Sequence, residues 1–414
     1  MIDRRTLMIS GAALAGLAAS PVRALDALDP VVAQLRGFVE QGDLPFASLR
    51  VAQRGRVLAQ AHISGAETIG PESIYRIYSM TKPVVAAGAV LLIEDGELTL
   101  DMPVADVVPE FADLQVLGEG DARVPARVMT VGHLLTHTCG LANSWGDARV
   151  APLYRQAGLT AVAWMYDPAI GGLDGFARRL GQLPLEHQPG SDWLYGYGLD
   201  IAGLIIERLS GERLGDFLKR RIFDPLGMTS TGFFVPEDQA DRLAGLYTAG
   251  EDGLTRMSSG AELTPLRRPL ADSGSGALLS TLSDYGRFAD MLAGRGAVNG
   301  ARVMSADSAR LMMTPWGPQE HIEPRLAQFY GGRLEGRMGQ ALGGVTRLDD
   351  ASGPGSTGEY AWGGAAPAAA NYKTSNRPAA PMPPPTHMVT TTHLAPRRWP
   401  SIKAWPVRRA PDMP

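Results

Sequence analysis

Apolar residues near the start of the chain follow a helical period first and an alternating one afterwards. Their spacing over residues 29–41 predicts an amphipathic helix. Two alternating runs follow, Ala47–Gln53 and Val57–Ile63, and the intervening Arg54-Gly55-Arg56 is typical of a hairpin turn. A helix followed by antiparallel strands predicts a helix packed on an antiparallel sheet.

The strongest helical run extends from Ser79 to Glu94. Because it is apolar on most of its faces, we expect it to be buried. Pro83 fits the first turn of such a helix, where its missing N–H has no intrahelical partner, and Gly96 is a natural stop.

From about residue 100 to 270 the pattern is mostly helical, most clearly at Val131–Thr136 and Leu199–Leu209. After Ser273-Gly274-Ser275-Gly276, a strand-like run over 277–280 leads into a predicted helix over 283–293. We therefore expect a helical lobe beside the sheet.

The composition is ordinary for a soluble globular enzyme, with 45% hydrophobic and 20% charged residues in 414 positions. This length predicts one large domain with an insertion, or two lobes. The net charge of -4 provides no broad basic surface, which argues against nucleic acid as a partner. The single cysteine, Cys139, excludes an internal disulfide and is more commonly a small buried hydrophobe than a nucleophile.

The first 24 residues have the pattern of an export signal. Arg4-Arg5 precede an apolar run from Leu7 to Ala19, and Val22-Arg23-Ala24 has small or apolar residues where a signal peptidase reads. The run is too short to span a membrane. The paired arginines favour the twin-arginine route, with a Sec signal as the alternative. We expect a mature chain from about Leu25, without a membrane span, in a periplasm-like compartment.

Ser79-Met80-Thr81-Lys82, at the start of the buried helix, is a candidate nucleophilic site. A serine alcohol needs a base at neutral pH. Positions i and i+3 share one helix face, so Lys82 can reach the Ser79 hydroxyl. Burial disfavours an ammonium ion, so the pKa of Lys82 can fall and the amine can share the role of base. Alone, the pattern also fits a serine N-cap with a surface lysine.

Four segments of the chain, one of which contains Ser79 and Lys82, carry a resemblance to a known family. Together they resemble class C β-lactamases and family VIII carboxylesterases over most of residues 30–366. The resemblance implies a β-lactamase-like α/β (α+β) fold, in which an antiparallel sheet is flanked by N- and C-terminal helices and joined by a helical lobe. The segments are Tyr75-Arg76-Ile77-Tyr78-Ser79-Met80-Thr81-Lys82-Pro83, Leu134-Leu135-Thr136-His137-Thr138-Cys139-Gly140-Leu141, Phe223-Asp224-Pro225-Leu226-Gly227-Met228 and Leu279-Ser280-Thr281-Leu282-Ser283-Asp284.

The family's second motif corresponds to Trp193-Leu194-Tyr195-Gly196-Tyr197-Gly198-Leu199-Asp200. By resemblance Tyr195 is the general base, held as a partial phenolate by Lys82, because a tyrosine with a pKa of ~10 needs such a cation near pH 7. The β-lactamase form has asparagine where this chain has Tyr197. We expect Tyr197 to take part in substrate binding.

The third motif is Trp362-Gly363-Gly364, the form common in the esterases, where β-lactamases have Lys-Thr-Gly. By resemblance these three residues bind substrate. The N–H groups of Ser79 and Ala365 are expected to form the oxyanion hole.

These motifs imply a serine hydrolase that cleaves small carboxylic esters through an acyl-enzyme on Ser79, with no metal or organic cofactor. A lactam substrate, and thus a β-lactamase, a D-Ala-D-Ala peptidase or a transacylase, stays open, as does a catalytically impaired or non-catalytic homologue. The G-x-S-x-G elbow of α/β-hydrolases is absent. His133 and His137 lack the glutamate of the zinc-protease motif, so we expect structural histidines at a helix end.

Residues 367–414 differ in composition from the hydrolase domain expected at 25–366. These 48 residues contain eleven prolines and seven basic residues against one acidic residue, Asp412. We expect an irregular tail. Our hypothesis is a reading-frame change near codon 367, and it fails if no alternative frame of the gene encodes an apolar strand and a C-terminal helix. The strand that carries Trp362 would then be a sheet edge.

Overall fold

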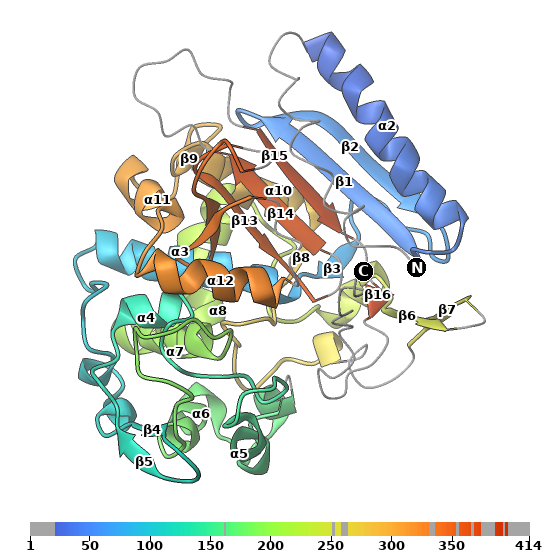
Figure 1. The fold of residues 1–414 in the computed structure, drawn as a ribbon. Coiled ribbons are helices and arrows are strands. Elements are labelled where there is room, and N and C mark those ends of the chain that lie inside the picture. Colours follow the sequence, from blue (N-terminus) through green and yellow to red (C-terminus); the bar gives the residue numbers. More distant parts are fainter. Residues whose placement is uncertain are drawn as a thin grey trace, which may run out of the picture.

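The structure, a computed structural model, describes residues 21–160, 163–250, 253–257, 264–330, 336–352, 356–365, 368–373, 386–391 and 394–395. A large antiparallel sheet and a helical lobe lie side by side (Figure 1). In spatial order the seven strands of the sheet are β11 (Met338–Ala341), β12 (Gly344–Arg347), β13 (Glu359–Gly363), β14 (Ala368–Lys373), β15 (Thr386–Thr391), β1 (Phe46–Gln53) and β2 (Arg56–Ser64).

The predicted hairpin is confirmed by the antiparallel pairing of β1 with β2. Its turn is shorter than expected, because Arg56 already belongs to β2. Arg54 and Gly55 have φ values of 52° and 73°. Positive φ at both central residues is the conformation whose twist matches that of two antiparallel strands.

Helices cover both faces of β1. Leu49 and Val51 pack against Leu35 of α2 (Pro21–Glu40). From the opposite face, Arg50 forms a 2.6 Å ion pair with Asp290 of α10 (Leu282–Ala293). Alternate residues of a strand point to opposite faces, so this one strand joins the two layers.

The helix predicted over 29–41 is confirmed but begins earlier, at Pro21, and so continues across the processing position expected after Ala24. The other residues of the expected export signal, 1–20, lie outside the described part of the chain.

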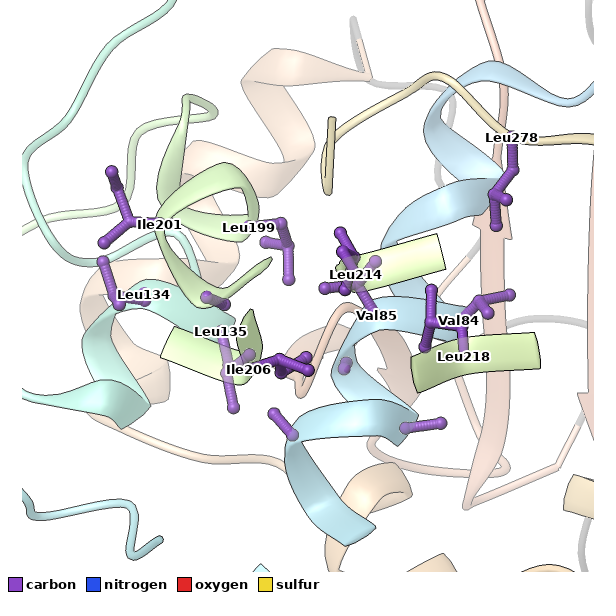
Figure 2. Close-up of a cluster of buried hydrophobic side chains, with 14 of the residues drawn as sticks. Val84, Val85, Leu134, Leu135, Leu199, Ile201, Ile206, Leu214, Leu218 and Leu278 are labelled. Atoms are coloured by element: carbon purple, nitrogen blue, oxygen red, sulfur yellow. The ribbon is translucent and has the colours of Figure 1, made fainter. Parts of the chain in front are cut away.

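The buried helix α3 (Thr81–Glu94) lies between the sheet and the lobe (Figure 1). Every residue from Thr81 to Leu92 is buried, as the apolar pattern predicted. Figure 2 shows Val84 and Val85 of this helix among side chains from α4 (Val131–Leu135), α7 (Gly198–Ser210) and α8 (Leu214–Leu218). Each such side chain contributes about 1.5–3 kcal/mol when fully buried, so α3 is a fixed support for whatever its first turn carries.

The remaining elements connect or cover these layers. None of the helices in the described residues is long and apolar enough to cross a membrane. The remaining strands pair as β3 (Ile74–Arg76) with β8 (Leu279–Thr281), β4 (Gln115–Leu117) with β5 (Arg123–Pro125), β6 (Tyr247–Gly250) with β7 (Gly253–Arg256) and β16 (Leu394–Ala395), and β9 (Ala297–Val298) with β10 (Ala301–Arg302). The remaining α-helices are α5 (Ala151–Gln156), α6 (Gly172–Leu180), α9 (Asp224–Leu226), α11 (Ala306–Met313) and α12 (Gln319–Phe329).

The structure differs from our expectation for the end of the chain. Residues 368–373 and 386–391, expected in an irregular tail, form β14 and β15 inside the large sheet. β13 is therefore not an edge, since Trp362 pairs with Ala370 of β14, and β15 in turn pairs with β1. A ladder is built from backbone groups, so strands on both sides can order a segment whose own side-chain pattern has no period. A flanking helix at the C-terminal end of the chain, which the resemblance implies, is not tested, because residues 396–414 lie outside the described residues.

Candidate active site

Ser79 lies in a short 3-10 turn, Tyr78–Met80, immediately before α3, rather than inside the helix as predicted. Tyr78 has a φ of 46°, in the left-handed region, so the chain turns sharply just before Ser79. The Thr81 hydroxyl fixes this turn, because it donates to the Tyr78 carbonyl at 2.6 Å and accepts from the Leu278 N–H at 3.1 Å. Ser79 remains partly exposed.

Lys82, in the first turn of α3, contacts Ser79 of the preceding turn, as the i, i+3 spacing predicted. Its Nζ is 3.4 Å from the Ser79 Oγ and also donates to the carbonyl oxygen of Ser275. The side chain is almost completely buried. Burial lowers the pKa of Lys82 to about 7, and the negative charge of Asp200 opposes this shift. A substantial fraction of this amine is therefore neutral at pH 7.

Tyr195 approaches the same serine from the loop that precedes α7. Its hydroxyl oxygen is 2.5 Å from the Ser79 Oγ, and the Lys82 Nζ is 4.5 Å from the centre of its ring. Burial raises the pKa of Tyr195 above its ordinary value, and the hydrogen bond with Ser79 only partly offsets this. Burial therefore favours the protonated phenol, in contrast to the partial phenolate that we expected.

Backbone contacts hold the Tyr195 loop in place. The Asn143 side-chain amide donates to the Tyr195 carbonyl at 3.0 Å, and the Leu194 N–H donates to the His137 carbonyl at 2.8 Å. At Gly196 a Cβ atom would lie only 1.9 Å from the Leu141 carbonyl oxygen. Only glycine permits this approach, which brings the loop against the segment around Leu141.

His137 is fully buried beside Tyr195. Its ring centre is 4.7 Å from that of Tyr195 and 6.0 Å from that of Trp362, on which it stacks. Burial, together with the charge of Lys82, holds the pKa of His137 well below its usual range, so the ring is neutral.

His133 and Cys139 have structural surroundings. His133 caps the start of α4, accepting from the Thr130 N–H at 3.1 Å, as expected for a histidine at a helix end. Within the described residues no group of three His, Cys, Asp or Glu side chains could hold a metal ion. Cys139 is buried, as predicted, and burial raises the pKa of its thiol to about 12. It is therefore a packing residue and a poor nucleophile.

Trp362 brings the third predicted motif to the site. It is buried on β13, with its ring centre 6.0 Å from that of Tyr195. Gly363 is the last residue of β13, and Gly364 and Ala365 follow it, partly exposed. β13 and β14 both pack against the turn that carries Ser79. The structure thus brings all three motifs together.

Tyr197 does not face this site, which corrects our expectation that it binds substrate. Its hydroxyl is held by the Ser144 hydroxyl at 2.8 Å and the Leu159 carbonyl at 2.9 Å, and its ring packs on Phe176 inside the lobe. The chain turns between Tyr195 and Tyr197, so one ring enters the site and the other enters the core.

Sequence reasoning missed several aromatic neighbours of Tyr195. Trp145 is 6.1 Å from it between ring centres, and Phe329, the last residue of α12, is 5.0 Å away. Tyr330 contacts Trp362 edge-on at 6.4 Å. No sequence pattern connects these positions, because they come from separate loops and a helix end.

Comparison with known proteins agrees with this geometry. A family model described as Beta-lactamase matches residues 31–382, beyond residue 366, where we expected the resemblance to end. Protein Rv1367c of Mycobacterium tuberculosis is 33% identical over 352 residues, 82% of this chain and 85% of its own. The lovastatin esterase of Penicillium rubens is 30% identical over 71% of this chain and 74% of its own. Among solved structures, EstCE1, a hydrolase with promiscuous acyltransferase activity, superimposes with a TM-score of 0.72 at 22% identity, covering 93% of this chain and 94% of its own.

Proposed function

The chain belongs to the Beta-lactamase family, and on that premise we propose that this serine hydrolase cleaves small carboxylic esters through an acyl-enzyme on Ser79. The observation that carries the proposal is the convergence of the Ser79 hydroxyl, the Tyr195 hydroxyl and the Lys82 amine, with contacts of 2.5 and 3.4 Å to the serine oxygen. A serine, a group that accepts its proton and a third group that orients them make up a nucleophilic site.

In the proposed acylation step, neutral Lys82 accepts the proton of Ser79 as the serine oxygen bonds to the ester carbonyl carbon. The carbonyl electron pair moves onto oxygen. When this tetrahedral species collapses, the C–O bond to the alcohol breaks and the leaving oxygen takes a proton from the Tyr195 hydroxyl. Lys82 then returns its proton to Tyr195. In deacylation, water takes the place of the alcohol and the same proton transfers run in reverse. Lys82 accepts the proton of Tyr195, Tyr195 accepts a proton from the attacking water, and the leaving Ser79 oxygen takes its proton from Lys82, which releases the carboxylic acid.

Developing negative charge on the carbonyl oxygen needs fixed hydrogen-bond donors. We assign this role to the N–H groups of Ser79 and Ala365. Support comes from the position of Ala365 just after β13, which packs against the Ser79 turn.

Apolar ester substrates are favoured by the aromatic surroundings of the serine. Phe329 and Trp145 pack on Tyr195, while Trp362 replaces the lysine that β-lactamases direct at a substrate carboxylate. Aromatic faces bind acyl chains through apolar contact. An alcohol acceptor in place of water would make the same site a transacylase. EstCE1, a hydrolase with promiscuous acyltransferase activity, is the precedent for this function.

We further propose that the chain is exported to a periplasm-like compartment and processed near Leu25, on the support of the apolar run behind Arg4-Arg5. N-terminal sequencing of the exported protein tests this assignment. Retention of residues 1–24 would contradict it.

Turnover of p-nitrophenyl butyrate and nitrocefin by the wild type and by Ser79→Ala tests the proposed reaction. We expect ester turnover that Ser79→Ala abolishes, and a covalent adduct at Ser79 with a fluorophosphonate by peptide mass spectrometry. Nitrocefin turnover alone would identify a β-lactamase. A folded wild type with neither activity and no adduct would identify a non-catalytic homologue. Adding butanol separates hydrolysis from acyl transfer through the amount of butyl ester formed.

A further inference from the structure

The carboxylate of Asp200 is fully buried in the first turn of α7, five positions after Tyr195. One of its oxygens accepts from the Ser273 hydroxyl at 2.5 Å and from the Ser275 N–H at 3.2 Å. The other oxygen has no hydrogen-bond partner in the described part of the chain. A buried carboxylate with so few partners destabilises the fold, which points to a role beyond stability.

The segment Ser273-Gly274-Ser275 connects Asp200 to the site. The Ser275 carbonyl accepts a hydrogen bond from the Lys82 Nζ, so the same residue contacts Asp200 through its N–H and Lys82 through its carbonyl. At Gly274 a Cβ atom would lie 2.0 Å from the Leu199 carbonyl oxygen. The segment therefore rests directly on the start of α7, where only glycine fits.

We propose that Asp200 is a positioning residue for Lys82, acting through the Ser273–Ser275 segment that it holds and through its own negative charge. The proposal rests on the proposed function of Lys82 as the proton acceptor of Ser79. A neutral amine has two N–H groups and one lone pair. When one N–H is directed at the Ser275 carbonyl, the lone pair is free to face Ser79 at 3.4 Å.

Four titratable groups influence Lys82 or its partner Asp200. The ring of Tyr195 lies over the Lys82 Nζ, and burial raises the pKa of Tyr195, which favours its protonated form. His137, which senses the charge of Lys82, is kept neutral by burial. Asp200 acts from α7 and raises the pKa of Lys82, against the larger effect of burial. Burial also raises the pKa of Asp200 itself, and the hydrogen bonds from Ser273 and Ser275 and the charge of Lys82 oppose this by favouring its ionised form. Burial raises the pKa of Tyr197 to about 12, and the charge of Asp200 adds to this effect, so Tyr197 stays protonated.

The test measures the rate at which a fluorophosphonate labels Ser79 between pH 5 and 9, by intact mass, in the wild type and in Asp200→Asn. Asparagine keeps the shape and an acceptor oxygen but removes the charge. We expect the acid limb of labelling to move to lower pH by about one unit and the plateau rate to fall, because a weaker base remains. The matched control is Asp284→Asn, another buried carboxylate, on α10, that bonds to Ser230 and Arg287 instead. Its limb should coincide with that of the wild type.

A second variant, Ser273→Ala, removes the hydroxyl link but leaves the charge of Asp200. We expect its acid limb to stay in place while the labelling rate falls at least fivefold. The proposal is overturned if the acid limb of labelling in folded Asp200→Asn coincides with that of the wild type. If that variant does not fold, an undiminished labelling rate in Ser273→Ala overturns the proposal instead. A wild type that is not labelled at all would instead contradict the proposed function, so the two failures are distinguishable.

Discussion

The hydroxyl oxygens of Ser79 and Tyr195 lie 2.5 Å apart, although 116 positions separate them in the chain. The contact joins the start of α3 to the loop before α7, and the Gly196 approach to Leu141 fixes that loop. Because the ring of Tyr195 also packs among aromatic side chains, its hydroxyl and its ring can be tested separately.

Tyr195→Phe removes the hydroxyl and keeps the packing. We expect kcat for p-nitrophenyl butyrate to fall by about a hundredfold to ten-thousandfold, since a positioned proton donor is lost. KM and the melting temperature should change little. Steady-state kinetics measures kcat and KM, and calorimetry measures the melting temperature. A variant with kcat within threefold of the wild type would exclude Tyr195 from proton transfer.

The pH dependence of kcat/KM reports on Lys82. Burial lowers the pKa of Lys82 to about 7, so the amine is protonated below this pH and cannot accept the proton of Ser79. We expect kcat/KM to rise about tenfold per pH unit below 7 and to level off above it. Lys82→Arg should be inactive throughout, because a guanidinium stays charged. A profile that is flat from pH 5.5 to 9 would contradict this role.

Ala365 offers a matched pair of variants for the oxyanion hole. Ala365→Pro removes the backbone N–H, whereas Ala365→Gly keeps it. We expect the proline variant to lose roughly a hundredfold to a thousandfold in kcat, the effect of one missing donor. The glycine variant should stay within about fivefold of the wild type. Equal losses in both would mean that another donor holds the oxyanion.

Phe329 is 41% exposed even though its ring contacts Tyr195 and Trp193. We expect Phe329→Ala to raise KM for p-nitrophenyl hexanoate by about tenfold and KM for the acetate much less, because a longer acyl chain has more apolar area to bury against this ring. Val128→Ala, at another exposed apolar position, is the control and should change neither value. Equal effects on both esters would remove Phe329 from the acyl-binding surface.

The order β13-β14-β15-β1 predicts the outcome of truncation after Ala366. Loss of β14 and β15 leaves β13 without a partner on the side of β1 and separates the sheet into two parts. We expect loss of cooperative thermal unfolding and of ester turnover, because unpaired strand edges and exposed apolar faces are left behind. A truncated chain with wild-type melting temperature and activity would show that 367–414 is dispensable.

Much of the architecture follows from local pattern. The period of apolar residues predicted the β1–β2 hairpin, the burial of α3 and the helices α7 and α10, since each depends on which face of an element meets the core. The spacing of Ser79 and Lys82 also fixed their contact, because three positions across a 3-10 turn that runs into a helix leave little freedom.

Where the sequence has no periodic pattern, tertiary contacts decided which strands form and where side chains lie. The ladder of β14 and β15 depends on neighbours far away in sequence. Tyr195 points into the site and Tyr197 into the core of the lobe because the loop turns between them. The sequence by itself therefore determined the family motifs and the nucleophile with its lysine. Only the tertiary structure decided that Tyr195 is buried, which raises its pKa, and that Asp200 reaches Lys82 through Ser275. Burial and through-space distance set the pKa values of Tyr195 and Lys82, and neither is a local property of the chain.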